Sequence, residues 1–237
     1  MTISLLHFNP STGTSASITA TGGPAVGGYV NHSWRSLGGC ATQGLFTNPW
    51  YADFVQQQLM DGQNAVQIVD KLIALDSDHD KRQCLVIDKQ GQSAALNGGD
   101  NIPYIGSLAF DSVAVAGNML ENAEVMTEFA SAFLASTTNN GTAVLSKGER
   151  PIYKPDYETF LPESLITALE AALNAGGDKR GTVSASLRVE YTDKAPIDIR
   201  VDWAKDNLIE ELKFVLGKVR ESSFQAFLDG VPNRIDI

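Results

Sequence analysis

The order in which predicted strands and helices follow one another is the feature that most restricts how this chain can fold. Alternating apolar and β-branched residues predict strands, and apolar residues three or four positions apart predict helices. In chain order the groups are strands 2–8, 14–21, 29–34 and 37–43, helices 48–62 and 64–73, strands 84–88, 92–96 and 113–116, helices 121–135 and 162–175, strands 182–191 and 197–203, and a helix from Asn207. Such grouping favours hairpin-built antiparallel sheets with helices packed outside, over a doubly wound parallel sheet.

Length and composition fit one large sheet-based unit. The chain has 237 residues, of which 43% are hydrophobic, and this is enough for a sizeable core. We therefore expect a single domain over residues 1–237. The apolar residues within 137–161 recur at no regular spacing, which predicts a long loop or an ordered insertion. A C-terminal helix and tail are expected over 207–237, with a break around Ser222 and Ser223.

Composition also restricts the partners and the compartment. The net charge of −10 argues against nucleic-acid binding, which usually requires a basic patch. No apolar stretch approaches the roughly 20 residues that span a bilayer. The N-terminal segment lacks the basic region of a signal peptide, so we expect no membrane partner and a cytoplasmic location. Cys40 and Cys84 lie in apolar strand-like runs, which predicts two buried thiols rather than a disulfide or a metal site.

The sequence lacks the common motifs for cofactors and metals. It contains no phosphate-binding loop, no paired zinc-ligand motif and no nucleophile-elbow serine. The acidic cluster of Asp76, Asp78, His79 and Asp80 lacks the glycine and the distal glutamate of a calcium loop, which indicates a solvated turn. We therefore expect neither a cofactor nor a bound metal.

Several short runs resemble, in their order and spacing, those of a known family. The runs are ATQ at 41–43, TNP at 47–49, RQ at 82–83, VID at 86–88 with Gly91, GNML at 117–120, AGGDKRG at 175–181, RVD at 200–202 and EL at 211–212. Together they resemble the uncharacterised bacterial and archaeal family called domain of unknown function 1028, from Thr2 to about Leu216. The resemblance implies an α+β fold, the four-layer αββα sandwich of the N-terminal nucleophile (Ntn) hydrolases. Proteasome β-type subunits share the grouped order of elements described above. A fold does not by itself supply an activity.

The resemblance makes Thr2 the first candidate for chemistry. Ntn hydrolases cleave amides with the side chain of the first residue of the processed chain, whose free α-amine is the general base. Thr2 would become that residue after removal of Met1. While Met1 is retained, the nitrogen of Thr2 is an amide and cannot act as a base. The alternative is a threonine whose branched side chain simply suits a strand.

Asp178 is the second candidate, because it lies between a predicted helix and a predicted strand. In proteasome-like subunits an aspartate at this junction helps to orient the N-terminal threonine, and a carboxylate here could accept a charge-assisted hydrogen bond from an α-ammonium. The alternative is a turn aspartate that bonds its own backbone. Arg180 could hold a substrate carboxylate through a bidentate pair, or could pair with Asp178.

Three more polar residues complete the candidate site. Asn118 ends a predicted strand and could help to form an oxyanion hole, or could cap the next helix. Gln43 lies at a strand end and could line a substrate pocket. His32 could act as a base or polarise a substrate, or could be a strand-end histidine that packs or points to solvent. The chain has no lysine before Lys71, although proteasome-like subunits use a lysine on the third strand to lower the pKa of the nucleophile and its base.

These residues support two hypotheses. The first is an amidohydrolase for a small amide or peptide-like substrate, with Thr2 as nucleophile, Asp178 orienting its amine and Asn118 stabilising the oxyanion. The second is a non-catalytic ligand-binding or interaction protein on the same scaffold, with Gln43, Asp178 and Arg180 lining the pocket. The missing lysine favours the second hypothesis. Both take a small-molecule or peptide-like ligand as partner, and both are compatible with a homo-oligomer, since related scaffolds often pair through their outer helices.

Overall fold

Two antiparallel sheets form the centre of the computed structural model, which describes residues 2–178 and 180–232. The first sheet has six strands in the order β10–β9–β2–β1–β8–β7: β1 (Thr2–Phe8), β2 (Ser15–Thr21), β7 (Gly106–Phe110), β8 (Val113–Asn118), β9 (Ser184–Glu190) and β10 (Ile197–Val201). The second sheet has four strands in the order β3–β4–β5–β6: β3 (Asn31–Trp34), β4 (Gly38–Gly44), β5 (Arg82–Asp88) and β6 (Ser93–Asn97).

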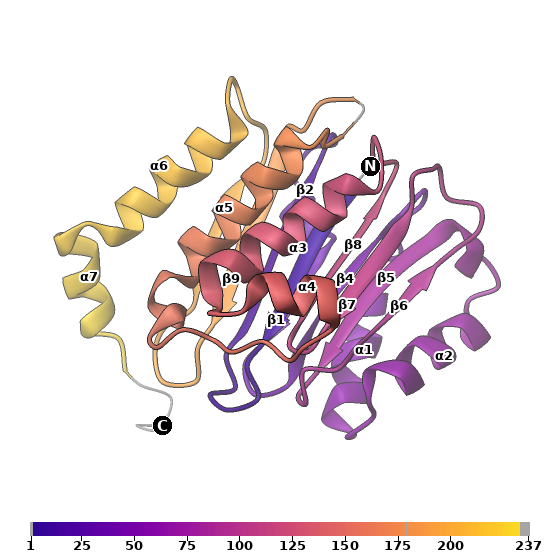
Figure 1. The fold of residues 1–237 in the computed structure, drawn as a ribbon, viewed down its shortest axis with the longest axis horizontal. Coiled ribbons are helices and arrows are strands. Elements are labelled where there is room, and N and C mark those ends of the chain that lie inside the picture. Colours follow the sequence, from indigo (N-terminus) through magenta and orange to yellow (C-terminus); the bar gives the residue numbers. More distant parts are fainter. Residues whose placement is uncertain (1, 179, 233–237) are drawn as a thin grey trace.

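Helices cover the outer face of each sheet (Figure 1). The helices of the described residues are α1 (Tyr51–Met60), α2 (Ala65–Leu75), α3 (Glu124–Thr137), α4 (Gly141–Lys147), α5 (Leu161–Asn174), α6 (Leu208–Arg220) and α7 (Ser222–Asp229), with 3-10 turns at Val26–Gly28, His79–Lys81 and Tyr157–Phe160. Helices α1 and α2 pack on the four-stranded sheet, α3 and α5 on the six-stranded sheet, and α6 against α5 and β10. None of the helices within residues 2–178 and 180–232 is long and apolar enough to cross a bilayer.

The alternation of side chains along β1 accounts for the stacking of the layers. Ile3 and Leu5 point toward α3 and α5, where they share a core with Phe129. Leu6 points the other way and packs with Leu85 between the two sheets. A further core lies between the four-stranded sheet and helices α1 and α2. The order of layers is therefore helix, sheet, sheet, helix, and the predicted αββα arrangement of two antiparallel sheets is confirmed.

The two cysteines belong to the core under α1 and α2. Cys40 and Cys84 are buried free thiols whose Sγ atoms lie 3.7 Å apart. The prediction of two buried thiols is confirmed.

The structure departs from the predicted elements in three places. Strand β7 is additional: it lies at the sheet edge with mostly half-buried side chains, so its sequence has no clear apolar alternation. Helix α1 begins at Tyr51 rather than at Asn48, whose Oδ1 instead accepts a hydrogen bond from the N–H of Trp50 at 3.2 Å. Residues 137–161 contain α4 and a 3-10 turn, tied by a β-bridge between Thr138 and Tyr153. The predicted break near Ser222 is present, between α6 and α7.

Candidate functional site

The amino end of β1, a central strand of the six-stranded sheet, carries the principal candidate residue. Thr2 lies opposite Thr21 of β2 on one side and opposite Asn118 of β8 on the other. Directly opposed residues of antiparallel strands project to the same face, so these side chains form one row. The row faces the four-stranded sheet, and its residues are 9%, 8% and 3% exposed. Oγ1 of Thr2 donates a hydrogen bond to Oγ1 of Thr21 at 3.2 Å.

A second row of polar side chains faces the first across the sandwich. Gln43 of β4, Gln83 of β5 and Asn97 of β6 lie directly opposite one another in the four-stranded sheet. Nε2 of Gln43 donates to the carbonyl oxygen of Thr2 at 3.2 Å, and Nδ2 of Asn118 donates to Oε1 of Gln83 at 3.0 Å. We call this double row the polar seam; its members are Thr2, Thr21, Asn118, Gln43, Gln83 and Asn97.

Gln83 is the centre of the polar seam and is fully buried. Its Oε1 accepts hydrogen bonds from Nε2 of Gln43 at 2.7 Å and from Nδ2 of Asn118 at 3.0 Å. Its Nε2 donates to Oδ1 of Asn97 at 2.7 Å and to one carbonyl oxygen each of β7 and β8 at 3.0 Å. A buried amide with all its hydrogen-bonding groups satisfied fixes the orientation of its neighbours. The Gln83 side chain therefore ties the two sheets together beneath Thr2.

Asp178 lies at this same end of the sheet. Oδ2 of its fully buried carboxylate accepts a hydrogen bond of 2.7 Å from the N–H of Gly22, the residue that follows β2. Its backbone forms a β-bridge with Leu120, shortly after β8. Because β2 and β8 are the two neighbours of β1, Asp178 spans the ends of both strands, beside the point where β1 begins with Thr2. The loop after α5 reaches this end of the sheet in Figure 1.

Position 22 requires glycine because the carboxylate approaches so closely. A Cβ atom at Gly22 would lie 2.5 Å from Oδ2 of Asp178, a separation that real Cβ atoms essentially never show. The glycine-rich loop after β2 therefore makes room for the Asp178 carboxylate.

Arg180 bonds to Asp178 through both its main chain and its side chain. The Arg180 N–H donates to Oδ1 of Asp178 at 2.8 Å, and a guanidinium nitrogen lies 3.1 Å from Oδ2. Asp178 is thus a turn aspartate and an ion-pair partner at once. The Arg180 side chain is 49% exposed, so part of it faces solvent above the buried carboxylate.

His32 points away from the polar seam. It lies opposite Cys40 in the β3–β4 pair, and Cys40 belongs to the core under α1 and α2, so His32 faces the outer side of the four-stranded sheet. Its ring stacks on Trp34, with centroids 5.9 Å apart and planes at 18°. Burial lowers the pKa of His32, which keeps the ring neutral near pH 7. The other predicted site residues come together at one end of the sandwich.

Asn118 does not cap the next helix, because α3 begins at Glu124 and its preceding residue is Ala123. Helix capping is therefore excluded for Asn118, whose side chain instead bonds to Gln83 across the sandwich.

The sequence predicts Gln43 as a site residue but not Gln83 or Asn97, the other two members of the second row. Gln83 had a recognisable signal, because it alternates with Leu85 and Ile87 on the face of β5 that points between the sheets. A glutamine at such a core position indicates a buried hydrogen-bond network. The pairing of Gln83 with Asn118 had no signal, since it depends on how the two sheets stack.

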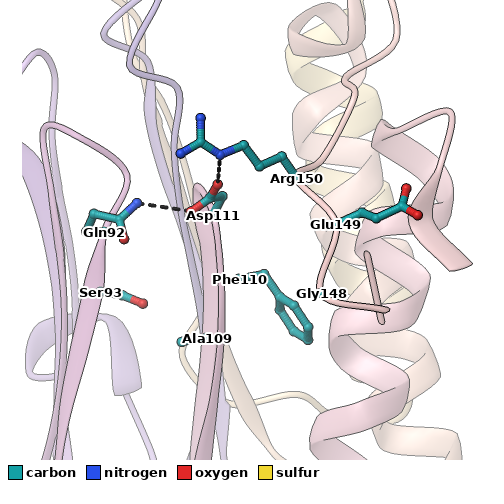
Figure 2. Close-up of a pocket in the computed structure, with 8 residues that line it drawn as sticks. All are labelled: Gln92, Ser93, Ala109, Phe110, Asp111, Gly148, Glu149 and Arg150. Carbon is teal, nitrogen blue, oxygen red and sulfur yellow. Dashed lines mark hydrogen bonds and ion pairs between the residues drawn. The ribbon is translucent and has the colours of Figure 1, made fainter. Parts of the chain in front are cut away.

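A hollow of about 430 Å³ lies at the opposite end of the sandwich (Figure 2). The β7–β8 turn and the segment after α4 line it, and Nε of Arg150 lies 3.0 Å from Oδ2 of Asp111. Asp111 lies in the two-residue turn between β7 and β8, and the first residue of β8 pairs with His7 rather than with Thr2. This hollow is therefore separate from the polar seam.

Within the described part of the chain, no group of three or more histidine, cysteine, aspartate or glutamate residues is placed to hold a metal ion. The acidic cluster at 76–80 forms a turn in which Arg82 pairs with Asp76 and Lys81 pairs with Asp78.

Stacked antiparallel sheets between helices, with polar side chains crossing between the sheets at one end, define a layered α+β protein. The chain belongs to the family of unknown function DUF1028, whose model matches residues 2–212. It is similar to the crystal structure of protein SPO2555 from Silicibacter pomeroyi, which is described as a protein of the same family. The two chains are 29% identical, with a TM-score of 0.84 over 99% of this chain and 93% of that chain. No match was found among curated proteins.

Proposed function

We propose that this protein is an Ntn-type amidohydrolase that acts on a small amide or peptide-like substrate, with Thr2 as its nucleophile after removal of Met1. The observation that carries the proposal is the setting of Thr2. Its hydroxyl lies at the amino end of a central strand, between Thr21 and Asn118, with the buried carboxylate of Asp178 held beside the same strand end. The αββα layering supports the same reading.

The chemistry would proceed in two steps. The α-amine of Thr2 takes the proton of Oγ1, which attacks the substrate carbonyl carbon. The resulting α-ammonium gives this proton to the leaving nitrogen as the C–N bond breaks, which releases an amine, leaves an ester on Thr2 and restores the neutral α-amine. Water, activated by the same amine, hydrolyses the ester to a carboxylic acid and regenerates the hydroxyl. Asp178 would orient the α-ammonium through a charge-assisted hydrogen bond. The Nδ2 group of Asn118 would donate to the oxyanion.

The side chain that reaches Thr2 from the four-stranded sheet is the neutral amide of Gln43. Gln43 donates to the Thr2 carbonyl oxygen at 3.2 Å, and no lysine precedes Lys71 in the chain. We propose that Asp178 is the charged group that sets the protonation of the α-amine of Thr2. A carboxylate favours the protonated amine, so the pKa of this amine would be higher than that of an amine beside a lysine. The half-exposed guanidinium of Arg180 would bind a substrate carboxylate at the rim.

Covalent labelling of processed protein tests the proposal. Protein from the native host, shown by intact mass to lack Met1, is treated with a β-lactone, and the modified peptide is identified by tandem mass spectrometry. We expect an ester on Thr2 in the wild type and none in the Thr2→Ala variant. Thr42→Ala is the matched control, since Thr42 is a buried threonine on the face of β4 that points away from the polar seam, and we expect it to retain labelling.

Two results would contradict the amidohydrolase. The first is Met1 retained on protein from the native host, and the second is no label on protein that has lost Met1. The non-catalytic alternative is favoured by the pairing of Asp178 with Arg180 and by the absence of a lysine. Thermal stabilisation of the processed protein by amino acids or acyl amides, with no product formed, would support that alternative.

A further inference from the structure

A groove of about 780 Å³ lies where the six-stranded sheet extends past the four-stranded sheet. The four-stranded sheet ends at β3, which packs against β2 and β9, while the six-stranded sheet continues to β10. The groove is bounded by β3, β9, β10, the 3-10 turn at 26–28 and one face of α1. It is not part of the polar seam, because its β3 residue His32 faces the opposite side of the four-stranded sheet.

A chain of ion pairs runs along the groove. Glu190 accepts from both Arg35, at 2.5 Å, and Arg188, while Asp198 accepts from both Arg188 and Arg200. Three guanidinium groups thus share two carboxylates, which leaves one positive charge in excess on a chain of net charge −10. Isolated surface pairs contribute little, but a continuous network holds its charges in fixed positions.

Arg200 is the member of this network best placed to meet a ligand. Only its Nε contacts Asp198, at 3.2 Å, so among the described residues both terminal nitrogens of its guanidinium lack an acceptor. Its side chain is 45% exposed and lines the groove. Two parallel N–H groups of a guanidinium match the two oxygens of a carboxylate or phosphate.

The floor of the groove is aromatic and incompletely hydrogen-bonded. The stacked rings of His32 and Trp34 line it, with the exposed thioether of Met60 from α1 beside them. Nε2 of His32 is buried and has no hydrogen-bond partner among the residues that the structure describes. Buried polar groups without partners are rare in folded proteins and commonly indicate that a water or a ligand completes the site.

We infer that this groove binds a small organic monoanion that carries a flat ring. Its carboxylate or phosphate would pair with Arg200, its ring would lie over Trp34 and beside Met60, and a polar hydrogen of the ligand or of a bridging water would reach Nε2 of His32. This binding site is independent of the chemistry proposed for Thr2.

Calorimetric titration with indole-3-acetate tests the inference, with indole-3-acetamide as a neutral ligand of the same shape. We expect saturable binding of the acid and at least about tenfold weaker binding of the amide, since the amide cannot form the ion pair. Arg200→Gln and Trp34→Ala should each weaken binding of the acid by about tenfold or more. Inorganic phosphate should compete, which would separate the contribution of charge from that of the ring.

Matched controls make the outcome decisive. Arg150→Gln removes an exposed arginine ion pair at the other end of the molecule and should leave the affinity unchanged. Thr2→Ala should also bind normally, so failure of the proposed catalysis does not affect this result. The inference is wrong if the acid does not bind, if acid and amide bind equally, or if Arg200→Gln binds as the wild type does. It is also wrong if Trp34→Ala converts a stable oligomer into monomers, because the groove would then be a subunit interface.

Discussion

Replacing Gln83 by leucine is expected to lower the free energy of unfolding by about 3 kcal/mol. The substitution removes the acceptor for the buried amides of Gln43 and Asn118, and the donor to Asn97 and to two carbonyl groups. Each buried polar group left without a partner costs about 1–3 kcal/mol, and the apolar surface of the leucine offsets only part of that sum. Urea denaturation followed by circular dichroism measures the difference.

Two further variants show whether the loss comes from the network. Gln57→Leu changes the same residue type on the exposed face of α1, where the Gln57 side chain bonds to Asp61, and should alter stability by no more than about 0.5 kcal/mol. The double variant Gln43→Leu with Gln83→Leu should be less destabilised than the sum of the single variants, because it removes both partners of one bond. Strict additivity would contradict the network.

Lowering the pH from about 7 to about 4 is expected to remove about 3 kcal/mol of stability through His7 alone. Burial lowers the pKa of His7 to about 4, against the opposing effects of the Ser112 carbonyl group and the Glu158 carboxylate. The ring bonds to the Ser112 carbonyl at 2.7 Å and to the hydroxyl of Tyr157 at 2.9 Å, with the Tyr153 ring alongside.

The sign follows from the two states of the chain. Below about pH 6.5 the unfolded chain binds a proton at His7 that the folded protein excludes, so stability falls as the pH drops. The loss levels off below pH 4, where the folded protein also takes up the proton. Denaturant titrations at several pH values of the wild type and of His7→Gln should show the variant losing stability less steeply over this window. Parallel curves for His7→Gln and the wild type would contradict this assignment.

The layering could be predicted from the sequence because it depends on local signals. Turn residues, capping residues and the spacing of the apolar positions group the strands and helices, and in the structure Asn64 caps α2 together with Gln67. Strand β7 could not be predicted in the same way, since an edge strand gains its hydrogen bonds from β8 without needing an apolar face. Helix α4 has only seven residues and carries too few apolar positions to show a period.

The candidate site could be predicted only where a motif marks it. The glycines before Asp178 and the place of Thr2 directly after Met1 are visible in the sequence. Nothing local indicates that Thr2 pairs with Asn118 or that Gln83 reaches across to it, because these contacts join residues far apart in the chain. Such contacts depend on sheet order and on the register between sheets, which a single sequence does not encode in any one segment.

The polar seam also governs how the two sheets can be aligned during folding. Apolar side chains such as Leu6 and Leu85 tolerate small slides against each other, because their attraction has little directionality. The amides tolerate much less, since a slide of one residue along the strands, about 3.4 Å, would break the bond from Asn118 to Gln83 and leave both side chains facing hydrocarbon. Apolar packing therefore holds the two sheets together, and the hydrogen bonds of the polar seam fix their position relative to each other. These hydrogen bonds lie at the end of the sandwich that carries Thr2.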